Sequence, residues 1–328
     1  MSDSSDRSIV VVCPGQGAQA VGMGRAWATN SPEAKAVFDE ADAILGDRLG
    51  ATLSSLCFDG PAERLDRTDA SQPAIFTASV AAWRGLQSAT AEHGGLAGQA
   101  MVATAGLSLG EYTALHLAGV FDFATGLRLV AERGRLMQAA ADEVGGGMVA
   151  LIGATDAEAE SVAADAAEGE VLVPANYNAP GQVVLSGAAT ACDRAAALAQ
   201  ERGFRATVLT VAGAFHSPLM QPAADRMAEA MSDIDFADPA VPVWSNVTAE
   251  PHVAGNVELL RQRLVEQITH PVRWSQSCVD LPSGEAIDYH EVAPGAVLRG
   301  LMRRIDRSRK VASHDEPDSK LSPRTTPA

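Results

Sequence analysis

The sequence predicts an α/β protein built on a parallel sheet, with a second, smaller unit inserted into the chain. Short β-branched runs alternate with helical stretches along most of the 328 residues, which is typical of a parallel sheet flanked by helices. Between residues 145 and 211 the order becomes strand, helix, strand, strand, helix, strand, the ferredoxin-like (βαββαβ) arrangement. Glycines at 145–147 and the pair at 212–213 are suitable hinges for such an insert.

Two β-branched or apolar runs predict the first strands of the larger unit. The run at 8–13 (SIVVVC) ends at Pro14-Gly15, and a second run covers 101–106; both have the length and composition of buried strands. Helices are expected where a capping residue precedes a helical pattern. The expected helices of this half begin at Ser31-Pro32 and Pro73 and cover 111–118 and, from the cap Asp122, about 122–141.

The same criteria define the rest of the chain. Within the insert we expect strands at 148–152, 171–174, 182–185 and 204–209, and helices at 156–168 and 190–201. After it we expect a helix from Pro218, a strand at 241–244, a helix at 257–267, a strand at 286–292 and a helix at 296–305. The larger unit therefore covers 8–144 and 212–310, the insert covers 145–211, and residues 1–7 and 311–328 are polar tails expected to be disordered.

Composition limits the classes of function. The chain is 47% hydrophobic with a net charge of −16, so it can bury a large core, and general attraction to nucleic acid or anionic membranes is not expected. Nothing in it approaches the roughly 20 apolar residues of a membrane span. The cysteines are scattered without a CxxC pair, which favours a reducing, cytoplasmic location and argues against a structural metal site or disulfide framework. They are Cys13, Cys57, Cys192 and Cys278.

Ser108 is the candidate nucleophile. Residues 106–110 (GLSLG) match G-x-S-x-G between a predicted strand and a predicted helix, the context of a nucleophile elbow. In that turn the serine is exposed at a helix N-terminus, where the amide of Leu109 and the helix dipole can stabilise an oxyanion. The alternative interpretation is a buried serine that packs in a tight turn.

A serine nucleophile requires a base, and His216 is the leading candidate. It directly precedes Ser217-Pro218, which indicate a new helix; a histidine at a helix N-terminus has a lowered pKa and stays neutral. His216 could instead be a half-exposed capping residue. The rival base is His290, because an ordinary α/β-hydrolase carries its histidine late in the chain.

Arg133 is a candidate for binding a substrate carboxylate. On its predicted helix it shares a face with Leu129, Val130 and Met137. An arginine at an apolar edge commonly extends to solvent or pairs with a carboxylate of its own protein. Its planar fork is equally suited to a substrate carboxylate. The sequence pattern leaves these possibilities open.

Taken together, the motifs resemble the malonyl-CoA:acyl-carrier-protein transacylase family, the acyltransferases of dissociated bacterial fatty-acid synthesis. The resemblance covers roughly residues 8–310, and its motifs are jointly very specific. It implies an α/β-hydrolase-like domain with a parallel sheet and a ferredoxin-like insert, in agreement with the element order above. The segments that carry it are 14–19 (PGQGAQ), 106–112 (GLSLGEY), 133–134 (RG), 176–182 (NYNAPGQ), 214–217 (AFHS) and 291–295 (EVAPG).

The resemblance also implies roles for individual residues. Ser108 would be acylated, and His216 would act as general base and then acid. The backbone amides of Gln16 and Leu109 would form the oxyanion hole. Arg133 would bind the malonyl carboxylate.

Three further implications concern the surroundings of the site. Asn178 and Phe215 would contact the substrate, with Phe215 resembling the malonyl-selecting form of related polyketide acyltransferases. A backbone carbonyl, plausibly that of Arg273, would orient His216 in place of a triad carboxylate. Most members have histidine where this chain has Leu107, a difference that bears on the shape of the pocket.

The leading interpretation is therefore a ping-pong acyltransferase that moves malonyl from CoA to Ser108 and on to the phosphopantetheine thiol of acyl carrier protein. Thioester exchange needs neither a metal nor a redox cofactor. The alternatives are a discrete acyltransferase of a polyketide pathway, a serine esterase or thioesterase that uses His290, and a non-enzymatic scaffold. Carrier proteins of this pathway are typically acidic, and the one dense basic run, at 299–310, is a candidate docking surface.

Overall fold

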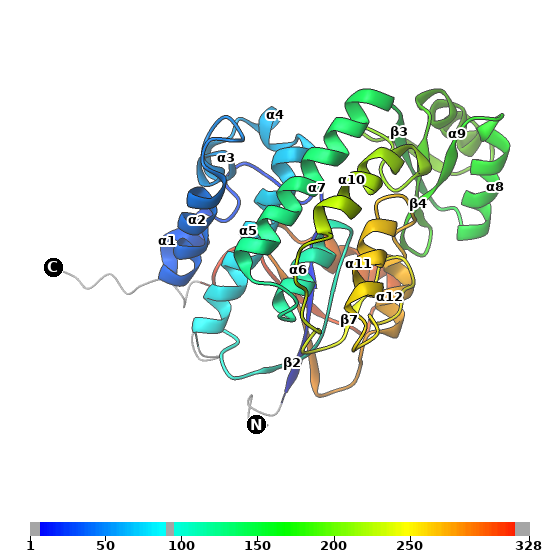
Figure 1. The fold of residues 1–328 in the computed structure, drawn as a ribbon. Helices are drawn as coiled ribbons and strands as arrows, with labels where there is room; N and C mark the ends of the chain where they lie inside the picture. The colour runs from blue at the N-terminus through cyan, green and yellow to red at the C-terminus, as the bar shows by residue number, and fades with distance from the viewer. Residues whose placement is uncertain (1–6, 90–94, 319–328) are drawn as a thin grey trace.

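The computed structural model describes residues 7–89 and 95–318. Its larger sheet has five parallel strands in the order β7-β2-β1-β8-β9, with β1 at the centre. Helices cover both faces of this sheet (Figure 1). The predicted α/β fold class is therefore confirmed. The strands are β1 (Ser8–Cys13), β2 (Ala100–Gly106), β7 (Val243–Trp244), β8 (Ile287–Val292) and β9 (Val311–His314).

The central strand β1 is buried on both sides, because alternate residues of a strand point to opposite faces. Ile9 and Val11 pack into the core on one face, and Val10 and Val12 pack into the core on the other. The first core is covered mainly by α2, α5, α6, α7, α10 and α11, and the second by α12 and α13.

The helices of the larger unit are mostly short, apart from two long ones that pack against each other, α5 and α7. A 3₁₀ turn, Pro218–Met220, precedes α10. The helices are α1 (Arg25–Asn30), α2 (Pro32–Leu45), α3 (Leu53–Asp59), α4 (Ala62–Leu65), α5 (Thr68–Ser88), α6 (Leu109–Leu117), α7 (Phe123–Val144), α10 (Gln221–Met231), α11 (Val257–Glu266), α12 (Trp274–Asp280) and α13 (Val297–Ile305).

The smaller unit is an antiparallel sheet in the order β4-β5-β3-β6, with α8 and α9 packed against it. The connection order β3-α8-β4-β5-α9-β6 is the predicted ferredoxin-like one. This unit lies at one end of the molecule, away from α1–α3 (Figure 1). Its elements are β3 (Gly147–Ile152), α8 (Asp156–Ala167), β4 (Leu172–Ala179), β5 (Gln182–Gly187), α9 (Ala189–Glu201) and β6 (Arg205–Val208).

Two expectations about the ends of elements were wrong. The chain does not become an irregular tail at Val311: β9 pairs in parallel with β8, and the indole Nε1 of Trp27 donates to the carbonyl oxygen of His314 at 2.9 Å. Backbone pairing at the sheet edge orders this polar segment. Helix α5 begins at Thr68 rather than at Pro73, which lies inside it.

At the other end of the chain, Arg7 pairs with Asp288 at 2.5 Å, so it is not part of a free tail. Residues 1–6 and 319–328 of the predicted tails lie outside the described residues.

Candidate active site

Ser108 stands at the turn between β2 and α6, where the G-x-S-x-G match predicted it. Its φ is +53°, in the left-handed region that few non-glycine residues adopt. The flanking glycines make this turn possible: a Cβ on Gly106 would lie 1.9 Å from the carbonyl carbon of Gly110, and a Cβ on Gly110 would lie 2.1 Å from the carbonyl oxygen of Cys13. The strained turn leaves the serine at the N-terminus of α6, as a nucleophile elbow requires.

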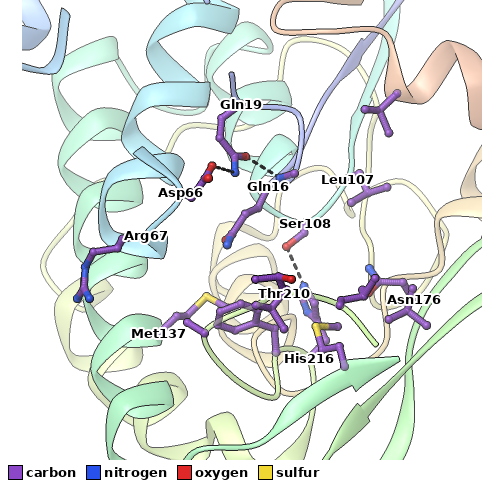
Figure 2. Close-up of a pocket in the computed structure, with 18 of the residues that line it drawn as sticks. Gln16, Gln19, Asp66, Arg67, Leu107, Ser108, Met137, Asn176, Thr210 and His216 are labelled. Atoms are coloured by element: carbon purple, nitrogen blue, oxygen red, sulfur yellow. Dashed lines mark hydrogen bonds between the residues drawn. The ribbon is translucent and has the colours of Figure 1, made fainter. Parts of the chain in front are cut away.

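His216 lies in contact with Ser108, because the two side chains meet at 2.8 Å between serine Oγ and imidazole Nε2 (Figure 2). The other ring nitrogen, Nδ1, donates to the carbonyl oxygen of Gln267 at 2.7 Å. That bond fixes the tautomer in which Nε2 carries no proton and can accept one from the serine. The φ of His216 is +58°, so the backbone of this residue is also strained.

The surroundings of His216 keep it neutral. The residue is buried, and its pKa is lowered from 6.5 to about 4. Burial is the largest cause and the nearby positive charge of Arg133 the second; both disfavour the imidazolium form. At neutral pH the imidazole is therefore available as a general base.

The carbonyl that orients His216 was wrongly expected to be that of Arg273. Gln267 caps the C-terminus of α11, and the last carbonyls of a helix have no partner within it. Its oxygen is therefore free to accept from His216. The carbonyl of Arg273 is occupied at the start of α12, where it accepts from the backbone amide and the hydroxyl of Ser277.

Arg133 reaches the same site from α7 and is only 1% exposed. Its Nη1 donates to Gln72 Oε1 at 2.7 Å, and its Nη2 donates to Gln267 Oε1 at 2.8 Å and to Ser108 Oγ at 3.1 Å. The guanidinium also lies over the ring of Tyr112, 5.4 Å from its centroid. Its Nε–H is buried without an acceptor among the described residues. The site therefore holds an oriented cation with one donor unused.

Sequence reasoning missed four buried polar residues around these three. Asn246 Oδ1 accepts from the backbone amide of Ser108 at 2.6 Å, and Gln72 and Gln267 hold Arg133. Glu111 follows the elbow and is fully buried. Its place beside the G-x-S-x-G motif was a usable signal; the other three are far from it in sequence, and nothing in their local pattern marks them.

A cleft of about 910 Å³ opens over Ser108, between the two sheets. The larger unit contributes Gln16, Leu107 and Phe215 to its walls, and the insert contributes Asn176 and Asn178. Figure 2 shows Gln16, Leu107 and Asn176 around Ser108. Leu107 and Phe215 are the apolar side chains among these wall residues. Leu109, the first residue of α6, is fully buried.

His290, the rival base, lies elsewhere. It belongs to β8, and its Nδ1 is 2.8 Å from Nε2 of His314 on β9. It is absent from the walls of the cleft over Ser108. The structure thus brings Ser108 together with His216 and does not bring it together with His290.

Within residues 7–89 and 95–318, no group of three or more His, Cys, Asp or Glu side chains is arranged to hold a metal ion. In the same residues no helix has both the length and the apolar character needed to cross a membrane.

Ser108 in contact with His216, with the buried cation of Arg133 beside them, is the arrangement expected of an acyltransferase that acts on an acidic acyl group. Residues 10–315 match the family model described as the acyl transferase domain. The chain is 43% identical over 310 residues to the malonyl CoA-acyl carrier protein transacylase of Escherichia coli strain K12, covering 94% of this chain and 96% of that protein. It belongs to the family of malonyl CoA-acyl carrier protein transacylases, as its motifs indicated.

Solved structures of malonyl transacylases have the same fold as this chain. The malonyl-CoA:acyl carrier protein transacylase of Xanthomonas oryzae pv. oryzae superposes with a TM-score of 0.85 at 42% identity, over 97% of this chain and 96% of that one. A malonyl-transacylase in complex with its type II polyketide acyl-carrier protein gives a TM-score of 0.87 at 37% identity, over 96% and 97% of the two chains.

Proposed function

We propose that Ser108, His216 and Arg133 carry out malonyl transfer from malonyl-CoA to acyl carrier protein in this chain. Ser108 Oγ attacks the thioester carbonyl while His216 Nε2, 2.8 Å away, takes its proton. The tetrahedral intermediate collapses, the C–S bond breaks, and the imidazolium returns the proton to the CoA thiolate. The phosphopantetheine thiol of the carrier then attacks the acyl-serine ester while His216 takes the thiol proton. The ester C–O bond breaks, the imidazolium returns the proton to Ser108 Oγ, and the malonyl group leaves on the carrier.

The oxyanion of each tetrahedral intermediate is bound by the backbone amides of Gln16 and Leu109. Leu109 is the first residue of α6, and the first amides of a helix have no carbonyl partner within it. Gln16 lies in the loop after β1 and lines the same cleft as Ser108. Donors fixed in this way stabilise developing negative charge with little reorganisation.

The observation that carries the choice of malonyl is the unused donor of Arg133. Its Nε–H is buried and has no acceptor among the residues described, while Nη1 and Nη2 are held by Gln72 and Gln267. An unpartnered buried donor is costly, and a carboxylate of the acyl group satisfies it. Phe215 lines the cleft beside His216 and limits the room for a branch on the acyl chain. Asn178 lines the same cleft, and its buried Oδ1 has no hydrogen-bond partner among the residues that the structure describes.

The reaction requires no cofactor, because thioester exchange changes no oxidation state. We place the enzyme in the cytoplasm, in keeping with four buried free cysteines. It supplies extender units for fatty-acid synthesis; the alternative is a polyketide pathway, favoured by the likeness to the polyketide malonyl-transacylase complex. An esterase that uses His290 is disfavoured because Ser108 Oγ contacts His216 and because His290 is absent from the walls of the cleft.

The insert is proposed to cover 145–211, since β3 begins at Gly147 and β6 ends at Val208. The acidic carrier is proposed to dock beside α13. Val297 and Leu301 of this helix line the cleft, and Arg304 donates to Gln182 Oε1 at 2.6 Å at its edge. Four cations line a second cavity of about 470 Å³ at the C-terminal end of α13: Arg303, Arg304, Arg307 and Lys310.

The test is transfer of radioactive malonyl from CoA to a purified holo carrier protein, with acid-stable labelling of the enzyme measured when carrier is omitted. Wild-type enzyme should form the labelled intermediate and pass it on. Ser108→Ala should form none, because no other nucleophile lies at the elbow. Label that persists on another residue, or wild-type enzyme that only hydrolyses malonyl-CoA when carrier is present, would overturn the proposal.

A further inference from the structure

Glu111 is the point at which the hydrogen bonds behind the active site meet. The residue is fully buried and lies in the first turn of α6. Its Oε2 accepts from Gln267 Nε2 at 2.6 Å and from the backbone amide of Asn246 at 3.1 Å. Its Oε1 pairs with His252 Nε2 at 2.8 Å. A buried carboxylate requires such partners, and here they come from two parts of the chain, the segment between β7 and α11 and the C-terminal end of α11.

Gln267 links this carboxylate to Ser108, Arg133 and His216. Its Nε2 donates to Glu111 and, at 3.0 Å, to the carbonyl oxygen of Ser108. The amide oxygen therefore faces Nη2 of Arg133 at 2.8 Å. The opposite amide orientation would set oxygen against carboxylate and NH₂ against guanidinium. The backbone carbonyl of the same residue orients His216.

Asn246 links the carboxylate to the elbow. Its Oδ1 accepts from the amide of Ser108 at 2.6 Å, and its Nδ2 donates to the carbonyl oxygen of Gly106 at 2.7 Å. The side chain thus brackets the strained turn on both sides of the nucleophile. Its own backbone amide is fixed by Glu111.

We propose that Glu111 is a positioning residue on which the selection of malonyl depends, although it touches none of the reacting groups. Through Gln267 it sets the position of Arg133 and the carbonyl that orients His216, and through Asn246 it sets the elbow. The resemblance to the family implies no carboxylate in contact with the histidine. In this chain the carboxylate of Glu111 acts on His216 and Arg133 through one intervening residue, Gln267. The proposal rests on the proposed role of Arg133.

The experiment measures kcat and KM with malonyl-CoA and with acetyl-CoA for wild type and Glu111→Gln. The substitution keeps volume but replaces the carboxylate by an amide, whose uncharged oxygen accepts a weaker hydrogen bond from Gln267 Nε2, so Gln267 is less firmly oriented. We expect kcat to fall with both donors, because His216 is less well oriented. We also expect the malonyl-to-acetyl ratio of kcat/KM to fall by about ten-fold beyond that, the effect of weakening one charge-assisted hydrogen bond to Arg133.

Glu291→Gln is the matched control. Glu291 is also fully buried and accepts two hydrogen bonds, from the backbone amides of Leu298 and Arg299 in the first turn of α13, and neither of these partners takes part in the hydrogen bonds around Ser108. Loss of a buried carboxylate there should leave the malonyl-to-acetyl ratio unchanged. An unchanged ratio in Glu111→Gln, with thermal unfolding close to that of wild type, would overturn the proposal.

Gln267→Met provides a second route in case Glu111→Gln does not fold. It keeps the backbone carbonyl for His216 and removes only the amide between Glu111 and Arg133. The ratio should fall as in Glu111→Gln, with a smaller loss of kcat, and the double variant should lower the ratio no further than Glu111→Gln alone. Independent, multiplying effects would contradict a shared path. If wild type itself shows no preference for malonyl, the proposed function fails rather than this role of Glu111.

Discussion

Replacing Arg133 by alanine should convert the enzyme from a malonyl to an acetyl transferase. The buried guanidinium presents an unused Nε–H and an Nη2 that already reaches Ser108 Oγ at 3.1 Å. Charge-assisted hydrogen bonds contribute about 1.5–3 kcal/mol each, so two contribute about 3–6 kcal/mol. At about 1.4 kcal/mol for each factor of ten, this corresponds to roughly two to four orders of magnitude in kcat/KM for malonyl-CoA.

Acetyl-CoA carries no carboxylate to desolvate, so its kcat/KM should stay near the wild-type value or rise. The assay compares kcat/KM for both thioesters at fixed carrier concentration, with thermal unfolding as a check that the variant folds. Arg133→Lys should be intermediate for malonyl, because an ammonium supplies charge without the planar fork. An Arg133→Ala enzyme that loses both activities equally shows a structural role, and one that loses neither places the carboxylate elsewhere.

Three further predictions concern the base and the elbow. With the pKa of His216 near 4, the unprotonated base persists well into acid, so kcat/KM should fall only as pH drops towards 4; a decline centred near 6.5 would contradict this. His216→Ala should lower kcat by roughly two to four orders of magnitude, whereas His290→Ala should leave it unchanged. Gly110→Ala places a Cβ 2.1 Å from the carbonyl oxygen of Cys13. The overpacking should lower the free energy of unfolding by about 1–3 kcal/mol and with it the melting temperature. In the control, Gly300→Ala, the added Cβ has no atom within 4 Å, so the free energy of unfolding should be unchanged or higher by about 0.5–1 kcal/mol. Equal melting temperatures of the two variants would argue against the tight elbow.

The sequence predicts the centre of the larger sheet because β1 and β2 are apolar runs that end at proline or glycine. The insert is equally predictable, because two helical segments separate its apolar strands and a capping box marks the start of α8. The segment at β9 is not: Val311–His314 is short and polar, and it is ordered by pairing with β8, a contact made by residues over 20 positions earlier. The local sequence of a strand does not reveal a partner that is distant in the chain.

The sequence offered Ser108, His216 and Arg133 as candidates through the G-x-S-x-G motif, the helix start after His216 and the resemblance to the family, and the structure places these three side chains in one cleft. The residues that hold them were not among the candidates. The carbonyl beside His216 comes from Gln267 rather than Arg273, and the difference depends on where α11 ends. An amide side chain such as Asn246 has no local pattern that reveals its role, because its partners lie over 130 residues away.

The positive φ angles at Ser108 and His216 mean that this protein gives up thermal stability at the two residues on which its proposed reactivity depends. Sparsely populated backbone conformations cost about 1–3 kcal/mol each, and glycine at either position would relieve that cost while abolishing the nucleophile or the base. A library selected only for survival at high temperature should therefore accumulate glycine at 108 and 216 and lose activity. Efforts to make a more durable enzyme are better directed at surfaces remote from the cleft, such as α8 and α9, where no such conflict exists.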